Sequence, residues 1–236
     1  GFDEALNEAG RAVAATREYG VGCGGPPLLN GTTSLHRELE VRLADFKKCE
    51  SAMLYSSGYA ANGGWLTGLM RGGDVLIYDE QSHASLIDGI QLGRVRSIPF
   101  AHNDIDDLSG RLVRVRRHHP DANVVVAVEG VYSMDGDTAQ LPAIKGVCED
   151  AGAWLAVDDA HGTGVLGESG RGSAEHFGME GRIELTMGTF SKVFASTGGV
   201  IAGSRDLVDT LRFFARSYMF SASPAIPVVA SVIAGI

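Results

Sequence analysis

Residues 154–164 read WLAVDDAHGTG, an apolar run that passes directly into a cluster of acidic, imidazole and glycine residues. The run Trp154–Val157 is apolar throughout, and so is the earlier run Val124–Val128. Continuous apolar runs are typical of parallel strands, because helices cover both faces of the sheet. The stretch therefore predicts a buried strand of a parallel sheet, followed by a loop that carries reactive groups.

Similar short apolar runs recur on both sides of this stretch and alternate with helical segments. The other runs are Ala52–Tyr55, Val75–Tyr78, Ser97–Phe100, Leu185–Met187 and Gly199–Ala202. Residues 2–18 and 34–46 have helical patterns, whereas 20–33, with its glycines and two prolines, reads as a loop. Alternation of strands and helices predicts an α/β fold with a mainly parallel sheet between helices. Without an internal repeat or linker, residues 1–236 are predicted to form one domain.

The composition argues against several classes of protein. The 236 residues contain 20 Lys and Arg against 29 Asp and Glu, and the net charge of −9 disfavours nucleic acid or an anionic membrane surface as a partner. No apolar run reaches the roughly 18 residues of a membrane span. Three cysteines are an odd number in a chain large enough to build its own core, so a reducing, cytoplasmic location is predicted. Both ends fall within helical patterns, as in a segment of a longer protein.

Polar, glycine-rich clusters follow the predicted strands. They occupy residues 56–58, 79–83, 129–137, 158–162 and 189–192. Since the carboxyl ends of parallel strands lie at one edge of a sheet, we expect one shared pocket there. Ser57, Gly58 and Tyr59 stand where a helix begins, and free N–H groups at such a point bind phosphate. A plain strand-to-helix turn would have the same sequence.

Four residues of these clusters have both an ordinary and a chemical interpretation. Lys192 could be a surface lysine, but its neighbours read as interior, and an amine removed from water has a lowered pKa and can form a Schiff base. Asp158 could cap a helix, or Asp158 and His161 could bind a metal. Because no third ligand stands at an informative spacing, no metal site is predicted. His83 could be a surface histidine or could stack on a planar cofactor.

Taken together, these clusters resemble the α-oxoamine synthase family of pyridoxal 5'-phosphate (PLP) enzymes, which includes the 8-amino-7-oxononanoate synthases and the serine palmitoyltransferases. The motifs that carry the resemblance run in the family's order: NGTTSLHRELE (30–40), SGYAAN (57–62), HAS (83–85), EGVYSMDGD (129–137), VDDAHGTG (157–164) and TFSK (189–192). The resemblance implies the PLP-binding large domain of a fold-type-I transferase over residues 1–236. An N-terminal arm and a C-terminal small domain would lie outside it.

The resemblance also implies a role for each candidate site residue. Lys192 would hold PLP as a Schiff base and move protons at the substrate Cα. Asp158 would pair with the pyridine nitrogen, which lets the ring accept electrons. His83 would stack on the ring, and His161 and Ser133 would bind its phenolic oxygen. The phosphate ligands would be Ser57, Gly58, Tyr59, Thr189 and Ser191, with Ser221 supplied across a homodimer that shares its active sites.

The implied reaction joins an amino acid to an acyl thioester, on coenzyme A or acyl carrier protein, with loss of CO₂, and gives an α-aminoketone. An aminotransferase on the same fold is one alternative. A non-catalytic subunit of a heterodimer is another, ranked last because Lys192, Asp158 and His161 are all present. Pro26 and Pro27 stand where the family often has Ser-Arg. The amino acid and the acyl donor are left open by the sequence.

Overall fold

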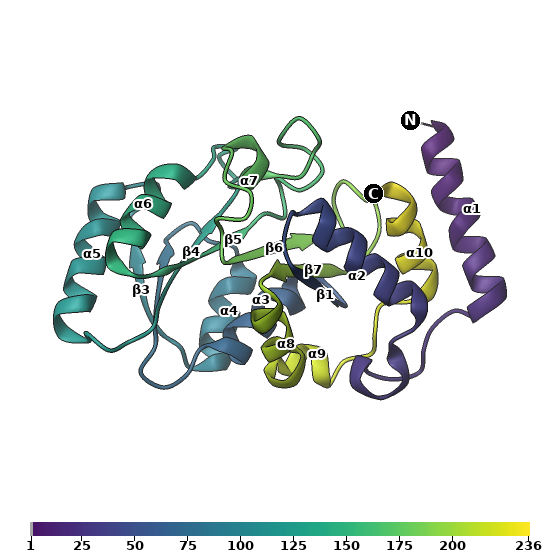
Figure 1. Ribbon diagram of the computed structural model, residues 1–236, viewed down its shortest axis with the longest axis horizontal. Helices are drawn as coiled ribbons and strands as arrows, with labels where there is room; N and C mark the ends of the chain where they lie inside the picture. The colour runs from purple at the N-terminus through teal and green to yellow at the C-terminus, as the bar shows by residue number, and fades with distance from the viewer. Residues whose placement is uncertain (1) are drawn as a thin grey trace.

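The computed structural model describes residues 2–236, with the backbone alone for residues 2–6, and its centre is a seven-stranded sheet (Figure 1). The strands are β1 (Ser51–Tyr55), β2 (Val75–Asp79), β3 (Arg96–Phe100), β4 (Val124–Glu129), β5 (Trp154–Asp158), β6 (Leu185–Thr189) and β7 (Gly199–Gly203). Their order across the sheet is β1-β7-β6-β5-β4-β2-β3. All seven predicted strands are present, so the α/β prediction is confirmed.

One strand departs from the parallel arrangement. β7 is antiparallel to both of its neighbours, β6 and β1, whereas the pairs from β6 to β3 are all parallel. The connection between β6 and β7 consists only of residues 190–198. A crossover to a parallel neighbour needs about a dozen residues or more, so this short connection turns the chain back instead. The expected mainly parallel sheet is therefore confirmed with one reversed strand.

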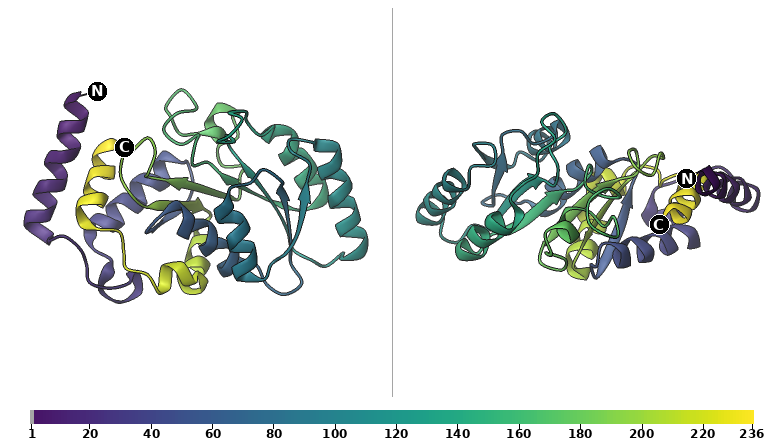
Figure 2. Two further views of the ribbon diagram at one scale, coloured as in Figure 1. Left: turned by 180° about the vertical axis from the view of Figure 1, so that it is seen from behind. Right: turned by 90° about the horizontal axis from the view of Figure 1, so that it is seen from above.

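Helices cover both faces of the sheet, as Figure 2 shows from above. They are α1 (Phe2–Tyr19), α2 (Ser34–Phe46), α3 (Gly58–Leu69), α4 (Ala84–Gly93), α5 (Ile105–His118), α6 (Leu141–Ala151), α7 (Ser173–His176), α8 (Arg205–Phe214), α9 (Arg216–Met219) and α10 (Ile226–Gly235). The predicted loop 20–33 is wrong over Pro27–Gly31, which forms a short π-helical turn closed by the Gly31 N–H on the Pro26 carbonyl at 3.0 Å.

The apolar strands divide their side chains between two core layers. In β4, Val125 and Ala127 pack with residues of α3 and α4, whereas Val124, Val126 and Val128 pack with residues of α5 and α6. This division explains why the strand reads as a continuous apolar run. α2 and α10 cover β1 and β7, and α1 lies beside α10 at one end of the molecule (Figure 1). Within residues 2–236, no helix combines the length and the apolarity that crossing a bilayer requires.

A buried ion pair connects the end of α2 to the loop that follows β5. The Lys47 ammonium donates to Asp159 Oδ2 at 2.8 Å, to Thr163 Oγ1 at 2.7 Å and to the Arg171 carbonyl at 2.7 Å. Asp159 also accepts from the backbone N–H and the hydroxyl of Ser173. The side chains of Lys47 and Asp159 are only 3% and 2% exposed. All three ammonium donors are thus used, and the loop that begins at Asp158 is fixed from both sides.

We predict that Lys47→Met destabilises the fold by about 3–5 kcal/mol, because it leaves the Asp159 carboxylate buried without its partner. Lys48→Met is the matched control, since the Lys48–Asp45 pair is exposed and contributes less than about 1 kcal/mol. Urea unfolding monitored by tryptophan fluorescence gives both free energies of unfolding. Equal losses in the two variants would show that the buried pair does not support the loop.

Candidate active site

A cavity of about 240 Å³ opens at the carboxyl ends of β4, β5 and β6, beside the first turn of α3. Nine of the eleven predicted site residues line it: Ser57, Gly58, Tyr59, His83, Asp158, His161, Thr189, Ser191 and Lys192. The remaining lining residues are Ser85, Glu129, Ala160 and Met187. The structure therefore brings the polar clusters that follow the strands into one pocket, as expected from the sheet.

Asp158, the last residue of β5, presents a buried carboxylate to this cavity. Its Oδ2 accepts from Asn62 Nδ2 at 2.7 Å, and its Oδ1 accepts from the Ala160 N–H at 3.1 Å. Asn62 is itself oriented by the Trp65 indole N–H, which donates to Asn62 Oδ1 at 3.1 Å. Burial raises the pKa of Asp158 and outweighs these two hydrogen bonds, which lower it. A cationic partner in the cavity would favour the charged carboxylate.

His83 is fixed in one orientation and one tautomer. It caps the start of α4, where its Nδ1 accepts from the Ser85 N–H at 3.2 Å. The Ser85 hydroxyl lies 2.7 Å from the same Nδ1 and accepts from Asn62 Nδ2 at 2.9 Å. Because His83 Nδ1 accepts from the Ser85 N–H, it carries no proton, so the Ser85 hydroxyl donates to it and the proton of the neutral ring lies on Nε2. Asn62 thus orients both the carboxylate and the imidazole.

Glu129 is a site residue to which sequence reasoning assigned no role. It ends β4 and stands directly opposite Asp158 in the register of the parallel pair β4–β5. Its Oε1 accepts from the His83 N–H at 2.7 Å. Burial first, and then the charge of Asp158, raise the pKa of this carboxyl well above its usual value of 4.5. Its place at the end of a buried apolar strand, like that of Asp158, was the signal that could have identified it.

The first turn of α3 offers an anion site. The Ser57 hydroxyl caps this helix by accepting from the Ala60 N–H at 3.0 Å. The Gly58 and Tyr59 N–H groups have no acceptor within the helix, as in any first turn. The Thr189 and Ser191 hydroxyls lie 2.9 Å apart on the same side of the cavity. The two N–H groups form the kind of donor set that binds a phosphate, and the two hydroxyls lie beside them, with that of Thr189 donating to the Gly198 carbonyl at 3.1 Å.

Two glycines make this close arrangement possible. A Cβ on Gly58 would lie 3.0 Å from the Thr189 Cβ, so a side chain there would crowd the hydroxyl. A Cβ on Gly199, the first residue of β7, would lie 2.7 Å from the Gly58 nitrogen. Real Cβ atoms do not tolerate such contacts with backbone. The start of α3 therefore rests directly on β7, with its N–H groups free to face a ligand.

The expected burial of Lys192 is not observed. Residues 185–188 are buried as predicted, but Lys192 is exposed and Val193 is 46% exposed. The connection 190–198 extends past the end of the sheet, and only Phe190 and Phe194 turn into the core, where their rings pack edge to face. The amine therefore lines an open cavity. His161, half-buried nearby, has its pKa lowered by burial and by the positive charge of Lys192.

Two predicted residues lie away from the cavity. Ser133 is exposed on the loop 130–138 that follows β4, and Ser221 is half-buried between α9 and α10. Neither lines the cavity of this chain. The roles that the resemblance implies for them stay predictions.

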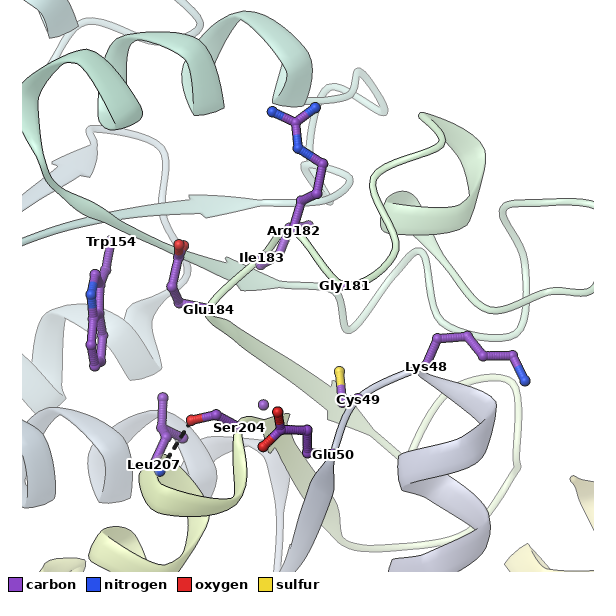
Figure 3. Close-up of a pocket in the computed structure, with 11 residues that line it drawn as sticks. Lys48, Cys49, Glu50, Trp154, Gly181, Arg182, Ile183, Glu184, Ser204 and Leu207 are labelled. Atoms are coloured by element: carbon purple, nitrogen blue, oxygen red, sulfur yellow. Dashed lines mark hydrogen bonds between the residues drawn. The ribbon is translucent and has the colours of Figure 1, made fainter.

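A second pocket lies at the opposite ends of the strands (Figure 3). It measures about 340 Å³ and is bordered by Cys49, Trp154 and Glu184. It contains none of the predicted site residues, and the Glu184 carboxylate already accepts from Lys145 and from the Leu155 N–H. Within the described part of the chain, no group of three or more His, Cys, Asp or Glu residues could hold a metal ion. The reactive groups are thus gathered at the carboxyl edge of the sheet.

Comparison with known proteins gives consistent matches. The model of the family described as aminotransferase class I and II matches residues 4–235. An 8-amino-7-oxononanoate synthase of Geobacter sulfurreducens is 46% identical over 212 residues, covering 90% of this chain and 54% of the relative. A serine palmitoyltransferase of Sphingobacterium spiritivorum is 42% identical over 222 residues, covering 94% and 55%. The chain spans about half the length of the curated relatives it matches.

Solved structures agree with these matches. A serine palmitoyltransferase of Sphingomonas wittichii superposes with a TM-score of 0.92 at 39% identity, over 96% of this chain and 56% of the other. Another serine palmitoyltransferase, solved with PLP, gives a TM-score of 0.92 at 37% identity, again over 96% and 56%. An 8-amino-7-oxononanoate synthase of Francisella tularensis gives 0.76 at 27% identity, over 95% and 62%.

We predict that Glu129→Gln makes the unfolding free energy depend less steeply on pH in the cofactor-free protein. A carboxyl whose pKa is raised on folding contributes stability at low pH, and this stability is lost as the pH rises above 4.5 toward the raised value. Glutamine keeps the oxygen that accepts from the His83 N–H but cannot ionise. Urea unfolding at several pH values tests this, with the exposed Glu168→Gln as control. A slope equal to that of the wild type would mean that Glu129 ionises normally.

Proposed function

Because the chain belongs to the aminotransferase class I and II family, and within it to the α-oxoamine synthases, we propose that it binds PLP and condenses an amino acid with an acyl thioester. CO₂ is lost and an α-aminoketone is formed. The sheet between helices is that of fold type I, as predicted. The acyl group arrives on coenzyme A or on acyl carrier protein. One observation carries the proposal: the buried Asp158 carboxylate and the α3 anion site share one cavity with Lys192.

The donor set fits PLP. The cofactor has a phosphate, a basic ring nitrogen and an aldehyde, and the cavity offers a matching group for each. The Gly58 and Tyr59 N–H groups suit the phosphate, Asp158 suits the protonated nitrogen, and the Lys192 amine suits the aldehyde. The missing Cβ of Gly58 keeps the phosphate end open.

When bound, PLP supplies an electron sink for negative charge at the substrate Cα. Asp158 holds the proton on the ring nitrogen, and the positive charge there favours the carboxylate that burial otherwise disfavours. The Lys192 amine removes the proton from the substrate Cα. His83, which lines the cavity, would lie against the ring and would leave its other face to the thioester. His161 and Ser133 donate to the phenolic oxygen of the ring.

We propose a homodimer in which the partner subunit's Ser221 completes the phosphate site. In this chain Ser221 lies between α9 and α10 and outside its own cavity. Phe213, Phe214 and Phe220, just before it, are 63%, 55% and 72% exposed. Exposed aromatic side chains gathered in one segment are typical of a protein–protein interface.

A cytoplasmic location is part of the same proposal. Cys23, Cys49 and Cys148 are free thiols, and burial raises the pKa of each of them. Unreactive thiols of this kind suit a reducing compartment.

We predict that borohydride fixes PLP to the wild-type chain at Lys192, and that Lys192→Ala abolishes this labelling. Lys192→Ala should also slow deuterium loss from Cα-labelled glycine, serine or alanine by about 10²–10⁴-fold, because the base is gone. Peptide mass analysis locates the label, and Lys48→Ala serves as control. Labelling that persists in Lys192→Ala would place the reactive amine elsewhere.

Product analysis separates the proposed reaction from transamination, which the family description also covers. With amino acid and acyl thioester, we predict a product that lacks the carboxyl carbon of the amino acid. A keto acid formed without release of CO₂ would identify an aminotransferase instead. Binding of PLP with no turnover of either kind, in the presence of all substrates, would favour the non-catalytic subunit.

We predict that, at a PLP concentration too low to saturate Ser221→Ala, mixing Lys192→Ala subunits with Ser221→Ala subunits gives more activity than either variant alone. If Ser221 acts across the dimer, one of the two sites in a mixed dimer has both wild-type residues. Ser221→Ala alone should weaken PLP binding by roughly tenfold or more, because a hydrogen bond to a charged group is lost. Lack of recovery in verified mixed dimers would show that Ser221 acts within its own chain or not at all.

A further inference from the structure

A polar cluster next to the cavity has no part in the chemistry described so far. It joins the ends of β2, β3 and β4 through Asp79, His102 and Asp137. His102 Nδ1 lies 3.0 Å from Asp79 Oδ1 and 3.2 Å from Asp79 Oδ2, and His102 Nε2 lies 3.0 Å from Asp137 Oδ2. Asp79 is fully buried, and the His102 side chain is 19% exposed. One imidazole thus bridges two carboxylates on different loops.

The number of protons in this bridge decides its charge. A carboxylate oxygen accepts hydrogen bonds, and a neutral imidazole has only one N–H to donate. If His102 were neutral, one of its ring nitrogens would direct a lone pair at a carboxylate oxygen about 3 Å away. Only the imidazolium donates to Asp79 and Asp137 together, so the observed geometry is that of the protonated ring.

The bridge holds together the two ends of the loop 130–138, residues 131–132 and 137–138, which form its neck. The Tyr132 N–H donates to the Asp137 carbonyl at 2.9 Å, and Val131 pairs with Thr138 in an isolated antiparallel bridge. Asn103, next to His102, donates from Nδ2 to Asp137 Oδ2 at 2.7 Å and to the Thr138 carbonyl at 3.1 Å. The Tyr132 and His102 rings pack edge to face with centroids 4.4 Å apart. His102 therefore contacts both strands of this neck, while Ser133 stands exposed beyond it.

We propose that His102, in its imidazolium form, is a positioning residue that clamps the loop 130–138 to β2 and thereby places Ser133 for the phenolic oxygen of PLP. The clamp itself is independent of the ligand, whereas its link to Ser133 rests on the proposed function. Replacing the imidazolium by a group with a single donor releases either Asp79 or Asp137, and the loop then loses its fixed position.

The charges around His102 give the clamp a defined pH dependence. Asp79 faces it from β2, Asp137 and the Tyr132 phenol face it from the loop, and the Glu80 carboxylate accepts from the backbone N–H of His102 at 3.3 Å. At the start of α5, Asp107 and Arg111 are paired with each other at 3.0 Å. Burial lowers the pKa of His102, but the hydrogen bonds and charges of Asp79 and Asp137 raise it by more. The net pKa is above its usual value of 6.5.

The raised pKa of His102 determines how its contribution to the free energy of unfolding changes with pH. A histidine whose pKa is raised on folding contributes stability that is fully present below its unfolded pKa of 6.5. That contribution is lost as the pH rises through the higher value in the folded protein. The clamp should therefore be closed below pH 6.5 and should open as the pH rises through that higher value.

The test compares the full chain as wild type, His102→Gln, Ser133→Ala and the double variant, with the exposed His118→Gln as control. Urea unfolding from pH 6 to 9 measures the clamp without cofactor. We expect stability to fall with pH in the wild type and in His118→Gln, and to fall less in His102→Gln. If His102→Gln folds poorly, Asp137→Asn, which keeps an oxygen acceptor but loses the charge, replaces it in every measurement.

Equilibrium dialysis with PLP measures the link to Ser133. We expect His102→Gln to weaken PLP binding by roughly tenfold, the effect of one lost hydrogen bond to a charged group. In the Ser133→Ala background, the same change should have no further effect, because the two residues act on one contact. Wild-type affinity in His102→Gln, or additive losses in the double variant, would overturn the proposal. Failure of the wild type to bind PLP would instead overturn the proposed function and the link to Ser133, while the unfolding curves would still decide whether the clamp exists.

Discussion

The structure depends on one buried carboxylate at the end of its central strand. Asp158 can stay in that position only because Asn62 and the Ala160 N–H donate to it, and a buried carboxylate without such partners is costly. Asn62 comes from α3, so the helix that offers the anion site is also the helix that holds the carboxylate. The following residue, Asp159, is fixed by Lys47, which prevents the loop from moving toward solvent. One series of contacts, from α3 through Asn62, Asp158 and Asp159 to Lys47, therefore positions both the anion site and the buried carboxylate.

The strands were predictable because their environment is uniform on both faces. β4 and β5 read as apolar runs since the side chains of Val124–Val128 and Leu155–Val157 enter one core layer or the other; only Trp154, at the start of β5 and 49% exposed, departs from the expected burial. The direction of β7 was not predictable from such a run, because residue periodicity is the same in either direction; the short connection 190–198 carried that information. Most of the candidate site followed from the same reasoning, since polar clusters after strands must gather at one edge of the sheet.

Two features could not be predicted from the sequence: the contacts between segments far apart in the chain, and the exposure of the side chains in the connection 190–198. Asn62 and Asp158, or Lys47 and Asp159, are about a hundred residues apart, and nothing in their local patterns pairs them. Lys192 was expected to be buried because apolar residues surround it in the sequence. In the structure those residues alternate, with Phe194 turned inward and Val193 outward, so the lysine emerges at the surface of the cavity.

Electrostatics explains why such a site should favour its ligand strongly. Glu129 and Asp158 stand side by side at the ends of adjacent strands; burial raises the pKa of both, and the charge of Asp158 raises that of Glu129 further. A protonated ring nitrogen placed against Asp158 would relieve this cost, because it would set a positive charge directly against the buried carboxylate. Any ligand that binds the folded state alone also stabilises it in proportion to its affinity. The arrangement that makes Asp158 useful for chemistry therefore also couples folding of this edge of the sheet to cofactor binding.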